Sequence, residues 1–352
     1  MGHDWGSDAG APAFVPPTLM SSMQDKRIVS IATGGGHCLA LSAEREVYSW
    51  GDGTHGSLGH ADRSATAGPR RIEALERVES IAAGISKSAA VDDRGRLFTW
   101  GHAVWPEGPS DLGYELDQAT ELQLTPKRVD ALSEDCEVGV GVAFGRGFTL
   151  AVTDAGAFFS FGSSRCGALG HDWSMIEVLP RRIEALTETG RRFVVVAAGA
   201  FHSLALTEEG HVYGWGHEYA NGHGQNQPTS QLVTALAGVR VLLVYVRGLS
   251  SCAVTEKGEL YTWGGGDLKS CNLGHGVAAA PKTPTRVEAL HGVKVRRRRS
   301  VALTHSWQMR TAWCGASASA RPSASARRTR RPGTSWCSPL RSRIYGCGPF
   351  HK

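Results

Sequence analysis

The sequence predicts an all-β protein of the propeller class, and three observations support this prediction. An aromatic residue followed by glycine recurs roughly every 50 residues along the chain. Each pair ends a stretch that is typical of a β-hairpin, and nowhere do apolar residues keep a sustained helical spacing. Repeats of this length are typical of arrays such as propellers, in which each blade is one small sheet. The five pairs are Trp50-Gly51, Trp100-Gly101, Phe161-Gly162, Trp215-Gly216 and Trp263-Gly264.

The fourth copy shows why each repeat is expected to form a hairpin. Residues 204–206 are a short apolar strand, Glu209-Gly210 is a turn, and residues 212–215 are the returning strand. Tight hairpin turns require a positive φ, which glycine adopts without a steric cost. The first copy has Arg45 at this place, for which we expect a looser turn or a turn of another type. The remaining copies have Gly95, Gly156 and Gly258.

Two further stretches complete each repeat. About 20 residues after the aromatic comes a phrase such as Arg-Arg-Ile-Glu-Ala-Leu, at residues 70–75 and again at 181–186. A β-branched run follows, as in residues 194–198. Three or four short strands per period, separated by Gly and Pro, suit a four-stranded blade. Because every copy carries the aromatic, we expect it to pack between neighbouring blades rather than to stack on a ligand.

Residues 199–216 resemble the repeat of the regulator of chromosome condensation (RCC1-type) family, which includes the alpha-tubulin-suppressor-like propellers. That repeat reads Gly-x-x-His-Ser/Thr, then an acidic residue and Gly, then apolar-Tyr-x-Trp-Gly. Its trailing Gly-x-Leu-Gly stands here at residues 56–59 and 167–170. The resemblance covers residues 28–295 and implies a seven-bladed β-propeller. Since the chain has five full repeats plus partial ends, we expect the propeller to be incomplete here.

The chain departs from that repeat at the blade histidine. Two copies keep it, as His37 and His202. The other three have Lys87, Phe148 and Ser250 at this place. We expect the two histidines to be structural hydrogen-bonding groups rather than ligands or bases.

Both ends of the chain differ from the repeats. Residues 1–27 are interpreted as part of another blade or as a ring-closing segment, because the opening Met-Gly-His-Asp-Trp resembles residues 169–173. Residues 296–352 hold 13 of the 38 Lys and Arg and no Asp or Glu, which leaves 25 basic against 33 acidic residues elsewhere. The predicted domains are therefore 1–27, the repeats 28–295, and an Arg/Ser-rich tail 296–352 that we expect to be disordered.

Two interpretations of the tail stay open. It is either a basic arm that binds nucleic acid, or the product of a frameshift between about Val293 and Arg299, which we favour. Read from the last base of the Ser306 codon, the codons of residues 307–318 permit Leu-Ala-Asp-Ala-Asp-Gly-Val-Val-Trp-Ser-Phe-Gly. That amino-acid sequence has the pattern of a further repeat hairpin. In that case the arginines of the tail are no evidence for DNA binding.

Composition and motifs argue against an enzyme. The chain has no Walker-type phosphate loop, no His-Glu-x-x-His and no Cys-x-x-Cys pair, so we expect no cofactor, no metal site and no catalytic residues. The eight cysteines are scattered, which gives no sign of an oxidising compartment. No apolar run reaches transmembrane length and residues 2–10 are polar, so we expect an intracellular protein, cytoplasmic or nuclear, without membrane contact.

Two loops depart most from the repeat and are therefore the candidate partner-binding sites. Residues 102–125 make the longest interval and combine aromatic with acidic side chains, which suits an interface anchor for a basic partner. A disordered insertion is the alternative interpretation of this loop. The second loop covers residues 217–230. The candidate residues are Trp105, Glu107, Asp111, Tyr114 and Glu115 in the first loop and Tyr219 in the second.

The leading functional prediction is a non-enzymatic protein-interaction platform, because a propeller presents its loops on a rigid scaffold. The resemblance implies an alternative. Some relatives act as guanine-nucleotide exchange factors for a Ran-type small GTPase at chromatin, and residues 102–125 would then act as a wedge. A second alternative, nucleic-acid binding, rests on the basic tail and holds only if that tail is genuine.

Overall fold

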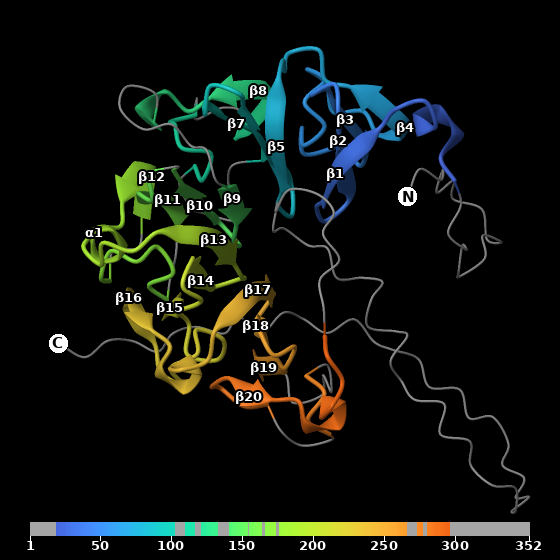
Figure 1. The fold of residues 1–352 in the computed structure, drawn as a ribbon. Coiled ribbons are helices and arrows are strands. Elements are labelled where there is room, and N and C mark those ends of the chain that lie inside the picture. Colours follow the sequence, from blue (N-terminus) through green and yellow to red (C-terminus); the bar gives the residue numbers. More distant parts are fainter. Residues whose placement is uncertain are drawn as a thin grey trace, which may run out of the picture. The chain divides into compact units, whose positions relative to one another are not determined.

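The computed structural model describes residues 19–102, 110–116, 121–132, 141–153, 155–163, 166–173, 176–265, 273–276 and 280–295. These residues all belong to one compact unit, Met1–Gln308. They form five four-stranded antiparallel sheets (Figure 1), and short helical turns follow the second to fifth sheets. In every sheet the strand order follows the chain, so each sheet is a meander made by one repeat. The all-β fold with five full repeats is thereby confirmed.

The sheets are numbered first to fifth along the chain. The first contains β1 (Ile28–Thr33), β2 (His37–Ser42), β3 (Val47–Gly51) and β4 (Thr66–Arg71), and the second contains β5 (Val78–Ala83), β6 (Lys87–Asp92), β7 (Leu97–His102) and β8 (Leu122–Arg128). The third contains β9 (Gly141–Phe144), β10 (Phe148–Val152), β11 (Phe158–Ser163) and β12 (Ile176–Arg182). The fourth contains β13 (Phe193–Ala198), β14 (His202–Thr207), β15 (Val212–Gly216) and β16 (Gln227–Leu232), and the fifth contains β17 (Val241–Arg247), β18 (Ser250–Thr255), β19 (Leu260–Gly264) and β20 (Thr285–Arg286). The helical turns are η1 (Ser21–Met23), η2 (Asp130–Leu132), α1 (Glu184–Thr187), η3 (Thr234–Leu236) and η4 (Glu288–Leu290).

The place of a strand in its sheet matches its composition. The second strands β10 and β14 are buried along their whole length and consist mainly of apolar and hydroxyl residues. The fourth strands β4, β8, β12 and β16 lie at the end of their sheets and are largely half-buried or exposed. Each contains a proline, which cannot donate to a further strand and so protects the edge against non-native pairing. These prolines are Pro69, Pro126, Pro180 and Pro228.

Successive sheets pack through their first strands. β1 contacts β5, β5 contacts β9, β9 contacts β13, and β13 contacts β17. Each of these interfaces holds a hydrophobic cluster that draws on two sheets and includes the repeat aromatic. The expected packing of the aromatic between neighbouring blades is confirmed at four places, where the side chain is fully buried. These residues are Trp100, Phe161, Trp215 and Trp263.

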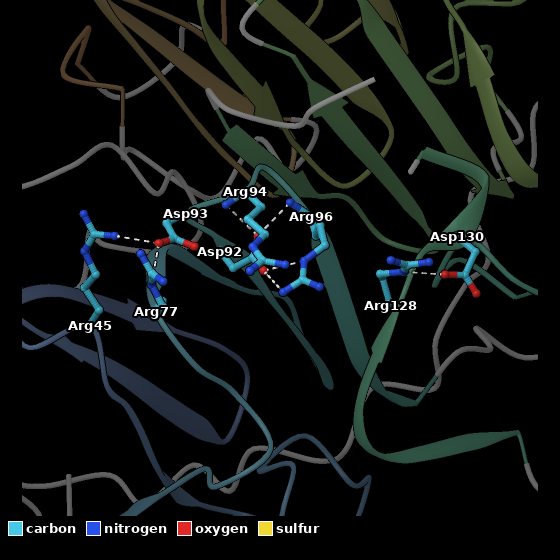
Figure 2. Close-up of polar contacts among 8 residues, drawn as sticks. All are labelled: Arg45, Arg77, Asp92, Asp93, Arg94, Arg96, Arg128 and Asp130. Atoms are coloured by element: carbon cyan, nitrogen blue, oxygen red, sulfur yellow. Dashed lines mark hydrogen bonds and ion pairs between the residues drawn. The ribbon is translucent and has the colours of Figure 1, made fainter. Parts of the chain in front are cut away.

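Arg45 occupies the hairpin turn of the first sheet in the same conformation as the glycines of the other turns. Its φ is 66°, against 71° for Gly95, and its N–H donates to Ser42 O at 3.0 Å. The prediction of a looser or different turn is therefore wrong. A left-handed conformation is unfavourable for arginine. Its side chain forms an ion pair with Asp93 at 3.2 Å, which Figure 2 shows, and a second one with Glu79 at 3.3 Å.

The last described residues make the contact that elsewhere joins one sheet to the next. The N–H of Val241, at the start of the fifth sheet, donates to Gly210 O at 3.1 Å. The N–H of Val295 donates in the same way to Gly258 O at 2.9 Å. Val295 therefore lies where the first strand of a following sheet would begin.

The first described residues resemble the end of a repeat. η1 precedes β1 as η3 precedes β17, and it packs Met20 and Met23 against Tyr48 and Trp50 of the first sheet. Residues 1–18 and 296–352 lie outside the described residues, so the proposed roles of both ends stay predictions.

Candidate interaction site

A repeated hydrogen-bond arrangement, which we call the seam, joins neighbouring sheets. At the first seam the carbonyl of Ser57 accepts from Trp100 Nε1 at 2.9 Å and from Ser88 Oγ at 2.8 Å. The accepting residue is the second position of the trailing Gly-x-Leu-Gly, and both donors come from the next sheet. The third and fourth seams have the same hydrogen bonds. Trp215 Nε1 and Ser203 Oγ donate to Ala168 O, and Trp263 Nε1 and Ser251 Oγ donate to Ala220 O.

The repeat histidine completes the seam. His202 Nε2 lies 2.8 Å from Ser251 Oγ, whose hydroxyl already donates to Ala220 O. The hydrogen-bond network therefore places a proton on Nε2. Burial lowers the pKa of His202 to about 3. A Cβ at Gly199 would overlap this ring, which explains the glycine of Gly-x-x-His.

The second seam departs from this arrangement. Lys87 replaces the histidine, and Asp111 stands where Ser57 does in the first sheet. Their side chains form a buried ion pair, while Thr149 Oγ1 donates to Asp111 O at 2.7 Å. Burial lowers the pKa of Lys87 and raises that of Asp111, and each charge opposes the shift of the other. Phe161 replaces the tryptophan here, so this seam has no indole donor.

Of the candidate residues in the first loop, three are described. Asp111 is buried by its pair with Lys87. Tyr114 is also buried, and its hydroxyl donates to Thr99 O at 2.9 Å. Glu115 is exposed. Trp105 and Glu107 lie outside the described residues, and a role of all five in partner binding stays a prediction.

Tyr219, the candidate of the second loop, belongs to a group of side chains from three sheets. Its ring stacks on His217 at 5.0 Å between centroids, and Lys282 Nζ lies 4.7 Å from its centroid. The ring centroids of Phe201 and His217 lie 6.4 Å apart, and the guanidinium of Arg146 lies 5.7 Å from the centroid of Phe201. We call these five residues the aromatic–cation cluster.

Sequence reasoning missed most of this cluster. Arg146 and Phe201 both stand in the Gly-x-x-His stretch that opens a second strand, at its first and second variable positions. Aligning those variable positions between repeats could have shown that side chains of neighbouring sheets approach one another there. No signal in the sequence pointed to Lys282.

The loops that carry these groups lie at one end of the sheets. In a meander, the loop after the first strand and the loop after the third strand emerge at the same end, and backbone bonds join them between sheets. Gly35 N donates to Ile85 O at 2.9 Å, and Ala200 N donates to Gly248 O at 2.7 Å. We call this end the loop face; its described loops are residues 34–36, 52–65, 84–86, 110–116, 121, 145–147, 166–173, 199–201, 217–226, 248–249, 265, 273–276 and 280–284.

The described residues show neither a metal site nor a membrane span. No three His, Cys, Asp or Glu side chains among them are placed to hold a metal ion. None of the helices in this part of the chain has the length and apolar character needed to cross a membrane.

Meander sheets, buried aromatic wedges and the seam together define a β-propeller built from RCC1-type repeats. The RCC1-like domain family matches residues 1–320, and the chain belongs to this family. It is 38% identical over 297 residues to the human E3 ubiquitin-protein ligase HERC2, covering 82% of this chain and 6% of that protein. It is 35% identical over 219 residues to the ultraviolet-B receptor UVR8 of Arabidopsis thaliana, covering 61% of this chain and 46% of the receptor. The chain thus spans less than half the length of these two relatives.

Solved structures agree with this fold. The structure of Prp20p from Saccharomyces cerevisiae, described with its binding to Gsp1p and histones, is similar with a TM-score of 0.61 and 25% identity, covering 74% of this chain and 65% of that one. Human WBSCR16 is similar in fold, with a TM-score of 0.63 and 22% identity, covering 77% of this chain and 69% of that one.

Proposed function

We propose that this chain is a non-enzymatic protein-interaction platform whose partner binds the loop face. The observation that carries the proposal is the backbone bonding between loops of neighbouring sheets, such as Ala200 N to Gly248 O at 2.7 Å. These bonds join the loops of the first and second sheets to each other, and likewise those of the third, fourth and fifth sheets. Side chains on loops joined in this way are held in fixed positions, which reduces the conformational entropy lost when a partner binds.

The scaffold below the loop face supports this proposal. The seams are buried, and each ties the loop after a third strand to the next sheet through a side-chain donor, as Trp263 Nε1 does on Ala220 O. Glu115 and Tyr219 belong to loops tied in this way. Loops on a rigid scaffold are a common place for binding residues.

Site-specific photo-crosslinking tests the proposal. A photo-reactive phenylalanine analogue is placed at Glu115 or Tyr219 on the loop face, and at Glu208 as the control. Glu208 follows the second strand of the fourth sheet, at the opposite end, and its side chain is 59% exposed. We expect protein adducts from the two loop-face positions and none from Glu208. Equal capture from all three positions, or none from any, would contradict the proposal.

Guanine-nucleotide exchange on a Ran-type GTPase is the second candidate function. It is supported by the similarity to Prp20p, whose structure is described with its binding to Gsp1p. In this case the loop at residues 102–125 would displace the nucleotide, and the site of action would be nuclear. The test is release of a labelled nucleotide from such a GTPase at micromolar concentrations of the protein. Release at the uncatalysed rate would remove this candidate.

Nucleic-acid binding through residues 296–352 is a third candidate, and these residues lie outside the described part of the chain. It rests on their 13 Lys and Arg. Binding by phosphate contacts weakens steeply as the salt concentration rises. We expect such salt-dependent binding of the full chain only if the tail is genuine, and unchanged binding on removal of residues 296–352 would exclude the tail as the site.

An intracellular location, cytoplasmic or nuclear, is part of the proposal and is tested by cell fractionation.

A further inference from the structure

We propose that the aromatic–cation cluster binds an acidic segment of the partner protein. Carboxylates of that segment pair with Arg146 and Lys282, and its backbone lies along the rings between these two cations. The inference rests on the proposed function and names the kind of partner sequence that the loop face recognises.

The cluster is a single row of contacts that crosses three sheets. Arg146 comes from the loop between β9 and β10, Phe201 from the loop between β13 and β14, and Lys282 from the segment before β20. His217 and Tyr219 continue the row from Phe201 to Lys282, and their ring centroids lie 5.0 Å apart. The N–H of Arg146 donates to Ala200 O at 3.3 Å, which fixes the first two loops to each other.

The two cations suit carboxylate ligands. The guanidinium of Arg146 lies 5.7 Å from the centroid of Phe201, and Lys282 Nζ lies 4.7 Å from that of Tyr219. Glu218 is an acidic neighbour of Lys282, and its carboxylate lies 3.0 Å from Lys282 Nζ. An ammonium group has three donors, so this pair leaves donors of Lys282 for a ligand. The side chain of Lys282 is 41% exposed, so a ligand can reach it.

His217 adds a neutral donor in the middle of the row. The backbone N–H of Tyr219 donates to His217 Nδ1 at 3.3 Å, which assigns the ring proton to Nε2. Burial lowers the pKa of His217; the Glu218 carboxylate opposes this shift and the charge of Lys282 adds to it, so the ring is neutral at physiological pH. Among the described residues its Nε2–H has no acceptor, and it is the right kind of group to donate to a carboxylate or a backbone carbonyl.

The arrangement favours an acidic peptide over the other ligand classes. A basic segment would meet Arg146 and Lys282, which repel it. The face of each terminal ring is already covered by a cation, which leaves less ring surface for bases to stack on than an open aromatic platform offers. Charge-assisted hydrogen bonds to carboxylates are about twice as strong as neutral ones, so both cations should contribute measurably.

Fluorescence anisotropy with a labelled oligoglutamate peptide tests the inference on the full chain. We expect binding that weakens with salt, and a Kd that rises roughly five- to tenfold in each of Arg146→Gln and Lys282→Gln. His217→Phe keeps the ring stack but removes the donor, and we expect a smaller rise. The matched controls are Arg182→Gln and Arg192→Gln, whose side chains are 46% and 69% exposed outside the cluster. Thermal unfolding of each variant shows that it is folded.

Three outcomes would overturn the inference. They are the absence of oligoglutamate binding, an equal loss in the cluster variants and the controls, and tighter binding of oligolysine or oligothymidylate than of oligoglutamate. If any one of these outcomes occurs while Tyr219 still forms crosslinks to a protein, the acidic ligand is wrong and the platform function stands. If crosslinking fails as well, the platform function is contradicted too.

Discussion

The ammonium group of Lys87 and the carboxylate of Asp111 form an ion pair inside the second sheet, where their side chains are 5% and 3% exposed. Lys87 also lies over the ring of Phe144 in the third sheet, with Nζ 5.1 Å from its centroid. In the first and fourth sheets a neutral histidine bonds to the next sheet from the same position. The pair therefore replaces a neutral bond between sheets by two charges that depend on each other.

Removing one charge of this pair should be more damaging than removing both. Lys87→Met leaves the carboxylate of Asp111 buried without a counter-charge, which costs about 3–5 kcal/mol of unfolding free energy. The double variant Lys87→Met/Asp111→Asn leaves no buried charge at this site and should lose clearly less unfolding free energy than Lys87→Met. Denaturant unfolding of the single and double variants measures both. A double variant that is as unstable as Lys87→Met would contradict this view of the pair.

The indole hydrogen bond of the seam should be measurable by comparing two tryptophans. Trp215→Phe removes the donor to Ala168 O, which lies 2.8 Å from Trp215 Nε1. Trp50 Nε1 is buried and has no acceptor among the described residues, so Trp50→Phe removes a similar volume but no hydrogen bond. We expect Trp215→Phe to lower the unfolding free energy by about 1 kcal/mol more than Trp50→Phe. Equal losses would show that the bond contributes nothing.

The turn at Arg45 should tolerate glycine. Its φ of 66° is unfavourable for any residue with a Cβ, whereas its exposed ion pairs with Asp93 and Glu79 contribute little. Arg45→Gly should therefore leave the unfolding free energy unchanged or raise it by up to about 1 kcal/mol. Arg45→Ala is the control, since it loses the ion pairs but keeps the strain, and it should be the less stable variant. The reverse order would show that the ion pairs matter more than the strain.

The two buried histidines should make the fold sensitive to mild acid. Burial lowers the pKa of His37 to about 4 and that of His202 to about 3, from an ordinary value of 6.5. Below pH 6.5 the unfolded chain therefore binds protons that the folded chain excludes, and stability falls as the pH falls towards these lowered values. From pH 7.5 to 5 the loss should be on the order of 2 kcal/mol for each histidine.

Denaturant unfolding at both pH values measures this loss. In His202→Gln the pH-dependent loss should shrink, although the variant is less stable at pH 7.5. The exposed His291 offers the control, because His291→Gln should keep the full loss. If His202→Gln retains the wild-type pH dependence, the lowered pKa is not the cause.

The nucleotide sequence of codons 285–352 should resolve the two interpretations of the tail. Val295 N–H donates to Gly258 O at the place where the next sheet would begin, so a strand is expected to follow it. We expect genomic DNA and transcript to show a one- or two-base change that restores the hairpin phrase of residues 307–318. Codons that cannot spell this phrase in any frame would instead establish the basic tail as genuine.

Much of the fold was predictable because it repeats. The aromatic-Gly pairs and the turn glycines mark the hairpins, and the four fully buried aromatics lie at the predicted interfaces. The turn at Arg45 was predicted wrongly because the hairpin turn imposes the same conformation without glycine: Arg45 N donates to Ser42 O at 3.0 Å as Gly95 N does to Asp92 O. Its ion pairs with Asp93 and Glu79 are contacts with the second repeat that the local sequence does not specify either.

The candidate site was less predictable, for two physical reasons. Residues 110–113 read Ser-Asp-Leu-Gly and take the place of the trailing Gly-x-Leu-Gly, so Asp111 is buried where Ser57 is in the first sheet. Without the glycine at its first position, this stretch looked like an irregular insertion. The aromatic–cation cluster draws on loops of three sheets, and its members come together only when the sheets pack.

Crosslinking from Tyr219, with and without the two cations of the cluster, tests the interaction surface as a whole. A photo-reactive phenylalanine analogue at this position is placed in the otherwise unchanged chain and in Arg146→Gln/Lys282→Gln, with the analogue at Glu208 as reference. We predict a protein adduct from Tyr219 that is strongly reduced when both cations are removed, and none from Glu208. An adduct that forms equally at Glu208, or no adduct at Tyr219, would contradict the assignment of the loop face as the binding surface.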